Sequence, residues 1–327
     1  MAPICTLEEC CISASAPLED ILALLKLRGG IVIKGLIDPQ DCARIKSELQ
    51  PYLDAQAPEK VAGIPSSEFF PSTTRKVGAL LTNSETVAHK ICLNPTILGA
   101  AKEILTVRNR LWLADDRPYC RSDPQVNVSI TLEIHPGAER QSLHRDDYNF
   151  NRILPKVDKW NQGRDLSILS FTAVSPVFPE NGGTMWIPGS HLWGETDVKP
   201  SYEDALVARM DIGDTFLTFH AGGTNSMKDG DPDSIRTLVG LGFCSGFCRQ
   251  EENQYLSLDH EKLKKLPVEV QKLAGWYISQ PNLGCVNYQH PLVSLGHADA
   301  PYDNDAFFES KETSEQYGSK YEPSPAV

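Results

Sequence analysis

The feature that most constrains the fold is a series of short apolar segments between residues 110 and 250, separated by Gly and Pro turns and not by helices. In the clearest segment every second residue is apolar: Val126, Val128, Ile130, Leu132 and Ile134. Such alternation is typical of a β-strand. Further strands are predicted at 111–113, 166–174, 184–187, 212–219 and 236–247. Strands that follow one another in this way indicate a mainly β fold, a double-stranded β-helix (jelly roll) barrel of the cupin-like type.

Helical signals flank this region, at 18–27, 38–53, 95–105 and 263–277. A short β-branched strand is predicted at 31–33, between the first two helices. Asp38 and Pro39 give the second helix an N-cap and a proline in its first turn. We therefore expect an N-terminal helical layer packed against the barrel.

The chain length indicates one elaborated domain. With 327 residues and a mass of 36.1 kDa the chain can bury a large core. Because no Gly/Ser-rich or Pro-rich linker divides it, we expect one domain over residues 1–300, with the jelly-roll core at about 110–250. The charged, Ser/Pro-containing segment 301–327 is predicted to be a frayed polar tail.

Charge and cysteine usage restrict the functional class. Lys+Arg 31 against Asp+Glu 43 gives a net charge of −12, and no basic stripe for nucleic acid is visible. No apolar run is long enough to span a membrane. Neither a secretory signal nor a C-terminal Ser-Lys-Leu-type address is recognisable, so we expect a cytoplasmic protein. The 9 cysteines form no Cys-x-x-Cys pair, which favours reduced, mostly buried thiols.

The stretch 141–147, Gln-Ser-Leu-His-Arg-Asp-Asp, carries the strongest chemical signal. If this stretch is extended, His144 and Asp146 point to the same face, because side chains alternate along a strand. An imidazole nitrogen and a carboxylate oxygen then converge on one point. On its own His-x-Asp is a weak signal, since a chain with 8 histidines matches it by chance about once.

His220 is the candidate that completes a metal site. It ends the apolar strand 212–219, which a jelly roll places across from the His-x-Asp strand, and Gly222 and Gly223 allow the backbone to turn close to a bound centre. Two histidines and one carboxylate form the three-ligand face of non-haem Fe(II) oxygenases, with the opposite positions open for substrate and oxygen. A strand-end histidine with a structural role is the competing interpretation.

Arg236 opens the strand that follows this site. A buried guanidinium needs an anionic partner and fits a carboxylate through two hydrogen bonds, which suggests an acidic co-substrate. Pairing with a nearby Asp231 or Asp233 is equally compatible with the sequence. Thr184, in a short strand between two turns, could hydrogen-bond such a carboxylate from the barrel interior. His191 follows Pro-Gly-Ser in a turn and is interpreted as structural.

Several motifs, in order along the chain, resemble the phytanoyl-CoA dioxygenase family of Fe(II)/2-oxoglutarate oxygenases. They are the 141–147 stretch, Glu180–Thr184, Pro188–His191, and His220–Asn225 leading to Arg236. The closest likeness is to the fungal natural-product branch, the meroterpenoid and indole-alkaloid dioxygenases, and it continues at 30–36 and at 275–287. One departure is 228–233, which lengthens the gap between His220 and Arg236 and is interpreted as an inserted loop.

The resemblance implies roles for named residues. The implied iron ligands are His144, Asp146 and His220. Arg236 is implied to bind a carboxylate of 2-oxoglutarate, and Gln141 and Thr184 to contact the same co-substrate. The implied reaction consumes O2, releases succinate and CO2, and oxidises an unactivated C–H bond by hydroxylation, desaturation, rearrangement or endoperoxide formation. Asp146 disfavours halogenation, because a halogenase leaves the position of this carboxylate empty.

The resemblance also bears on substrate and assembly. It implies an apolar natural product as substrate, since the acidic chain shows no cationic patch for the phosphates of an acyl-CoA, and it implies a homodimer. Segments 69–76 and 282–290 are candidate substrate-facing loops, and a plain surface role is equally compatible. Two other functions remain open from the residues alone: a metal-dependent hydrolase or isomerase on a cupin-like barrel, and a non-catalytic barrel that binds a ligand.

Overall fold

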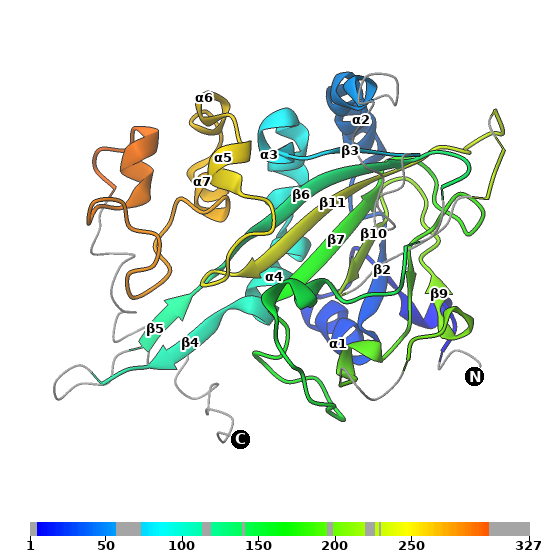
Figure 1. Cartoon of the computed structure of the whole chain (residues 1–327), viewed down its shortest axis with the longest axis horizontal. Coiled ribbons are helices and arrows are strands. Elements are labelled where there is room, and N and C mark those ends of the chain that lie inside the picture. Colours follow the sequence, from blue (N-terminus) through cyan, green and yellow to red (C-terminus); the bar gives the residue numbers. More distant parts are fainter. Residues whose placement is uncertain are drawn as a thin grey trace.

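The computed structural model describes residues 5–56, 73–112, 119–138, 141–194, 199–219, 226–228 and 230–300. A seven-stranded sheet crosses the centre of the molecule (Figure 1). Its strand order is β1-β2-β10-β7-β11-β6-β3, and neighbouring strands are antiparallel except β1 and β2. The strands are β1 (Cys11–Ser13), β2 (Gly30–Lys34), β3 (Thr74–Val77), β6 (Pro124–Ile134), β7 (Ser167–Ala173), β10 (Thr215–Thr218) and β11 (Arg236–Ser245).

Two small antiparallel sheets accompany the large one. They are β4 (Val107–Arg110) with β5 (Tyr119–Ser122), and β8 (Met185–Trp186) with β9 (Leu206–Val207). Trp186 of β8 packs on Phe216 of β10 with ring centroids 4.8 Å apart, so β8 and β9 cover part of one face of the large sheet. Within the described ranges these strands do not join into a closed barrel. The sheet-dominated fold with flanking helices is confirmed, and the jelly-roll closure stays a prediction.

Helices cover the opposite face of the large sheet. They are α1 (Leu18–Arg28), α2 (Pro39–Ala55), α3 (Leu80–Asn83), α4 (Pro95–Leu105), α5 (Gln254–Ser257), α6 (His260–Leu263) and α7 (Val268–Leu273). Asp38 caps α2 by accepting from the Gln40 N–H at 2.7 Å, as predicted. Helix α4 contacts β6, β7 and β11 and also α1, which confirms the N-terminal helical layer. Shorter helical turns lie at Glu8–Cys10, Val87–Cys92, Asp146–Phe150, Ser190–Leu192, Tyr202–Asp204 and Pro291–Leu295.

Strand β6 has the predicted alternation, but its polar side chains are the buried ones. Ser129 is fully buried, whereas the apolar row on the other side of the strand is half-buried: Val128, Ile130 and Leu132. The Ser129 hydroxyl accepts from the Leu80 N–H at 3.0 Å and donates to the Glu252 carboxylate at 2.9 Å. These bonds satisfy the buried Ser129 hydroxyl on the face toward the helices. The apolar row therefore lies on the face that carries the candidate site.

Two predicted strands differ from the structure. Leu111 and Trp112 belong to no strand, and the Trp112 side chain is 71% exposed; β4 ends just before them. The strand predicted at 212–219 is shortened to β10, because a turn with Gly213 at φ +90° precedes it. A Cβ on Gly213 would lie 2.1 Å from the Ile37 carbonyl oxygen, so the turn requires glycine there.

The C-terminal part also departs from the prediction at one point. Of the helix predicted over 263–277, only Val268–Leu273 is helical, as α7, and a separate helix, α6, ends at Leu263. Pro267 lies between them and cannot donate a backbone hydrogen bond to continue α6. The predicted polar tail, 301–327, lies outside the described residues. None of the helices in the described residues is long and apolar enough to cross a bilayer.

Candidate functional site

His144 and Asp146 lie side by side between β6 and β7, although their segment is not the strand that was predicted. Arg145 is extended, at φ −113° and ψ 131°, and a 3₁₀ turn begins at Asp146. One extended residue is enough to bring its two neighbours to the same side: His144 Nε2 is 3.5 Å from Asp146 Oδ1. His144 Nδ1 lies 2.7 Å from the Ser142 carbonyl and donates to it, which leaves Nε2 as the nitrogen for a metal.

The carboxylate of Asp146 fits a bound cation. Its Oδ2 atom is buried and has no hydrogen-bond partner in the described part of the chain. A buried carboxylate oxygen without a partner is costly, and a metal ion would satisfy it. Burial lowers the pKa of His144, but the hydrogen bond and charge of Asp146 outweigh burial and raise the pKa overall. One imidazole nitrogen and one carboxylate oxygen are ligand types that Fe(II) accepts.

The third predicted ligand, His220, lies outside the described residues, as do Gly222 and Gly223. The strand that leads to it, β10, is described, and Phe219 stacks on His191 with ring centroids 5.5 Å apart. Among the described His, Cys, Asp and Glu side chains, no group of three could hold a metal ion. The metal role of His220 therefore stays a prediction.

Arg145, between the two candidate ligands, belongs to a buried ion network on the other side of the segment. Its guanidinium donates to both oxygens of Asp147, at 3.1 and 3.2 Å, and to the Trp193 carbonyl at 3.2 Å. The Asp165 carboxylate is 3.6 Å away, and Arg164 donates to the same Trp193 carbonyl at 2.8 Å. This network was not predicted from the sequence. The alternation that places residues 144 and 146 on one side also places 145 and 147 together on the other.

Glu251 is a second side chain near the site that the sequence analysis missed. It accepts from Asn149 Nδ2 at 3.0 Å and from Asn127 Nδ2 at 3.3 Å. Asn149 lies in the 3₁₀ turn that begins at Asp146, so this contact joins the loop after β11 to the turn with the candidate ligands. Burial and the charge of Asp146 raise the pKa of Glu251. No local pattern could have shown this, because only folding brings these segments together.

Arg236 is a buried cation that has no carboxylate beside it among the described residues. It begins β11, is 3% exposed, and donates from Nη1 to the Gly182 carbonyl at 2.6 Å and to Thr184 Oγ1 at 3.4 Å. Its Nε has no hydrogen-bond partner in the described residues. Burial lowers the pKa of Arg236 to about 9. The alternative of an ion pair with Asp231 or Asp233 is wrong, since neither carboxylate lies within ion-pair distance of this guanidinium.

The remaining candidate residues from the sequence are Thr184, Gln141 and His191, and each has a different environment. Thr184 is buried next to Arg236, as its candidate role requires. The Gln141 carbonyl accepts from the Tyr202 hydroxyl at 2.9 Å, and its side-chain role is not tested by this contact. His191 is fully buried, and its Nε2 lies 2.9 Å from the Lys26 carbonyl, so its structural interpretation is supported. Burial lowers the pKa of His191 to about 4, which keeps the ring neutral.

The two candidate substrate-facing loops are only partly described. Residues 69–72 lie outside the described residues, and Thr74–Val77 is strand β3, paired with β6. A strand is therefore present where part of a loop was predicted. Segment 282–290 is an exposed loop, in which Leu283 and Tyr288 are 53% and 88% exposed.

Comparison with known proteins gives a consistent picture. The profile "Phytanoyl-CoA dioxygenase (PhyH)" matches residues 25–229. Dioxygenase swnH1 of Arthroderma benhamiae is 32% identical over 288 residues, which cover 87% of this chain and 91% of that protein. Dioxygenase cnsJ of Penicillium expansum is 31% identical over 283 residues, which cover 84% of this chain and 81% of that protein. HygX of Streptomyces hygroscopicus, solved with nickel and 2-oxoglutarate, is more distant: TM-score 0.49 at 15% identity, over 72% of this chain and 90% of that chain.

The likeness to HygX is too weak to support an assignment. The profile match and the fungal relatives are sufficient to assign the family without it. The profile spans more than half of the chain, includes His144, Asp146, Thr184 and the predicted ligand His220, and stops before Arg236. Both relatives are fungal dioxygenases matched over most of their length. The hydrolase, isomerase and non-catalytic alternatives are thereby set aside. The chain belongs to the phytanoyl-CoA dioxygenase family and is an oxygenase that depends on Fe(II) and 2-oxoglutarate.

Proposed function

We propose that this oxygenase oxidises an unactivated C–H bond of a small, largely apolar fungal secondary metabolite, with release of succinate and CO2. The observation that carries the assignment of the site is Arg236, a buried guanidinium with only neutral hydrogen-bond partners among the described residues. A buried charge without a counter-ion is strongly unfavourable. A carboxylate of 2-oxoglutarate supplies the missing anion in a bidentate arrangement.

The residues have distinct roles in this proposal. The iron ligands are His144, Asp146 and His220, and this assignment is supported by the Oδ2 atom of Asp146, which has no hydrogen-bond partner in the described part of the chain. When bound, the iron supplies the redox chemistry with O2. Arg236 and Thr184 hold the distal carboxylate of 2-oxoglutarate, which orients the opposite end of the co-substrate toward the ligands. Gln141 contacts the same molecule.

Arg145 acts as a positioning residue and touches neither co-substrate nor metal. The peptide that carries both described ligands is anchored through its contacts with Asp147, Asp165 and Trp193. Ligands that are held in place before metal binding lose little conformational freedom when the metal arrives. Glu251 supports the same turn from the other side through Asn149.

The substrate class follows from the wall of the site. Val128, Ile130 and Leu132 form a half-buried apolar row on the site-facing side of β6. An apolar wall excludes water and favours an apolar substrate. A net charge of −12 disfavours an acyl-CoA with its anionic phosphates. Hydroxylation, desaturation, rearrangement and endoperoxide formation all begin with attack on a C–H bond that such a wall presents.

We also propose the barrel architecture, the domain organisation, the cellular location and the oligomeric state of the protein. The large sheet and the β8–β9 pair form the two layers of a double-stranded β-helix. Residues 1–300 are one domain, followed by a polar tail at 301–327. The protein is cytoplasmic and acts as a homodimer.

An anaerobic titration of the metal-free protein tests the proposal. Fe(II) is added first and 2-oxoglutarate second, and the visible metal-to-ligand charge-transfer band of the chelate is recorded. We expect the band at one iron per chain. Iron binding without the band would contradict the 2-oxoglutarate site, and absence of iron binding would contradict the His144, Asp146 and His220 ligand set.

A further inference from the structure

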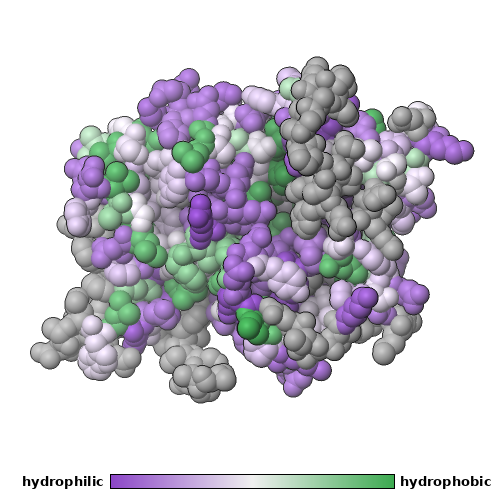
Figure 2. Space-filling view, viewed as in Figure 1, coloured by the Kyte–Doolittle hydropathy of each residue, from purple (hydrophilic) through white to green (hydrophobic). Residues whose placement is uncertain are grey.

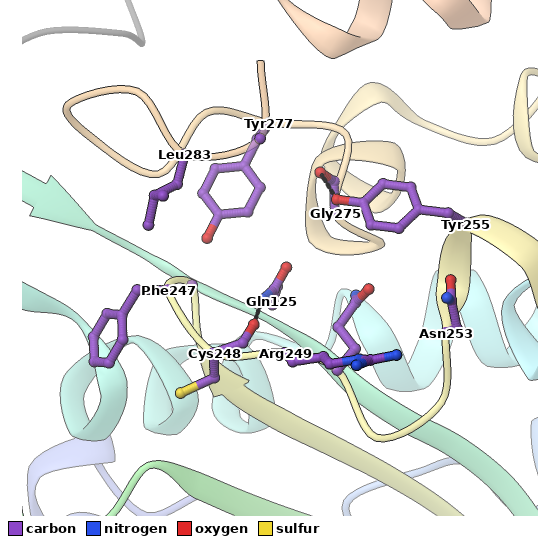
Figure 3. A pocket seen from close by; sticks show the side chains of 12 residues that line it. Gln125, Phe247, Cys248, Arg249, Asn253, Tyr255, Gly275, Tyr277 and Leu283 are labelled. Carbon is purple, nitrogen blue, oxygen red and sulfur yellow. Dashed lines mark hydrogen bonds between the residues drawn. The ribbon is translucent and has the colours of Figure 1, made fainter. Parts of the chain in front are cut away.

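A cavity of about 420 Å³ lies beyond the C-terminal end of β11 (Figure 3). Its floor is the loop after β11, with Phe247 and Arg249, and its roof is the segment with Tyr277 and Leu283. Tyr255 closes one side. Because Arg236 begins β11 and this cavity follows its last residue, the two lie at opposite ends of the same strand. The cavity is therefore distinct from the proposed carboxylate site of 2-oxoglutarate.

The aromatic walls of this cavity are fixed in place. The Tyr255 hydroxyl donates to the Gly275 carbonyl at 2.8 Å, and the Tyr277 hydroxyl donates to the Asp123 carbonyl at 2.8 Å. Gly275 has φ +115°, and a Cβ there would lie 2.7 Å from the Tyr255 hydroxyl oxygen. The close approach of backbone and ring thus requires glycine. Such walls are pre-organised, so a ligand does not have to order them.

Two buried glutamines of the cavity lining are hydrogen-bonded to backbone carbonyls. Gln125 donates to the Cys248 carbonyl at 2.8 Å, and Gln250 donates to the Val126 carbonyl at 2.8 Å. Arg249 is the only charged residue among the residues that line the cavity; it is exposed to solvent and forms no ion pair with the described residues. A cation at the base of an aromatic cavity offers two donors in one plane, a geometry that matches a carboxylate.

The mouth of the cavity is apolar. Phe247 and Leu283 lie on opposite sides of the opening and are 46% and 53% exposed. Large apolar side chains that are exposed next to each other often mark a binding site. Figure 2 shows hydrophobic surface between hydrophilic patches on the left half of this face, the side on which Figure 1 places the C-terminal segments. The ring of a ligand would stack on these side chains and on the tyrosines.

We propose that this cavity is a second binding site, for a planar organic anion whose ring lies between Phe247 and Tyr277 and whose carboxylate pairs with Arg249. The volume is within the range of small-ligand sites, about 300–1,000 Å³. The site has a physical link to the proposed iron centre. Glu251 follows the lining residue Gln250 and contacts Asn149 of the turn with Asp146.

The test compares a charged probe with a neutral isostere. Isothermal titration calorimetry of the full-length, metal-free protein is carried out with indole-3-carboxylate and with indole-3-carboxamide. We expect the carboxylate to bind at least tenfold more tightly, and Arg249→Gln to remove that difference. Phe247→Ala is expected to weaken both probes. Arg44→Gln is the matched control, because Arg44 is an exposed arginine of α2 that pairs with Asp41.

Each other outcome overturns the inference. No binding of either probe, equal affinity for both, or an unchanged difference in Arg249→Gln would each exclude an anion site at Arg249. A repeat titration with saturating Ni(II) and 2-oxoglutarate separates this site from the co-substrate site. We expect the indole-3-carboxylate affinity to persist, and its displacement would place the probe at Arg236. Because the first titration needs no metal, its result does not depend on the proposed oxygenase site.

Discussion

Two buried arginines of this protein are surrounded in opposite ways. Arg145 is 8% exposed and has two carboxylates around it, Asp147 in bidentate contact and Asp165 at 3.6 Å. Arg236 is 3% exposed and has only the Gly182 carbonyl and the Thr184 hydroxyl among the described residues. Within the described residues, Arg145 is therefore neutralised by neighbouring carboxylates, whereas Arg236 has only neutral partners. This difference is the reason for the proposal that Arg145 has a structural role and that Arg236 binds an anion.

The largest effect is expected at Asp146, the proposed iron ligand next to Arg145. Asp146→Ala removes the carboxylate whose Oδ2 atom has no hydrogen-bond partner among the described residues, so we expect loss of oxygenase activity and of the charge-transfer band. Activity is measured as succinate release, and the band is measured anaerobically. Retained turnover in this variant would show that Asp146 is not an iron ligand.

The two arginines are expected to affect stability with opposite signs. Arg145→Met leaves Asp147 and Asp165 buried without their partner and should lower the free energy of unfolding by about 3–5 kcal/mol. Arg236→Met removes a buried charge that has no counter-ion among the described residues, and it should raise the free energy of unfolding of the ligand-free protein by on the order of 1 kcal/mol. Urea denaturation of the metal-free protein without 2-oxoglutarate measures both. A destabilised Arg236→Met variant would show that the chain already supplies an anion.

Removal of the Arg236 charge should weaken co-substrate binding. Loss of a buried charged partner costs about 2–5 kcal/mol, so we expect Arg236→Ala to raise the KM for 2-oxoglutarate by about 100-fold. Steady-state kinetics at varied 2-oxoglutarate measure this change, and Arg249→Ala is the matched control. If the KM for 2-oxoglutarate is unchanged in Arg236→Ala and raised in Arg249→Ala, the arginine that binds 2-oxoglutarate is Arg249.

A smaller effect is expected from neutralising the partner of Arg145. Asp147→Asn keeps the shape of the side chain but weakens its hold on Arg145, so metal affinity should fall by about 10–100-fold. Ni(II) titration of the metal-free protein measures the affinity. Glu48→Gln is the control: its carboxylate accepts from Ser84 and Thr86 and lies in α2, so it can lower stability without lowering Ni(II) affinity. Equal loss in both variants would mean that Asp147 acts only through stability.

The smallest effect is expected at the hydroxyl beside Arg236. Thr184→Val preserves the shape of the side chain and removes one hydrogen bond, worth about 1 kcal/mol. The KM for 2-oxoglutarate should rise by about fivefold with little change in kcat. A loss as large as that of Arg236→Ala would give Thr184 a greater role than a neutral supporting contact.

Elements with short-range signals were predicted well from the sequence. Helices α1 and α2 have caps, turns and helical periodicity within their own segments, and their bounds match the prediction closely. Predictions were weaker where the structure depends on contacts between residues that are far apart in the sequence. Strand β6 was identified by alternation, but the buried side of the strand depends on Leu80 and Glu252, which lie far away in the sequence.

The sequence by itself determined the family, the sheet-dominated fold and the neighbourhood of His144 and Asp146, because these rest on local patterns and motif order. It left the partner of Arg236 open, since two aspartates lie within five positions of it. Only the tertiary structure decided that neither aspartate reaches Arg236, and that Arg145 and Glu251 lie around the same turn. The physical reason is that charge pairing depends on distance and burial in three dimensions, which sequence separation does not fix.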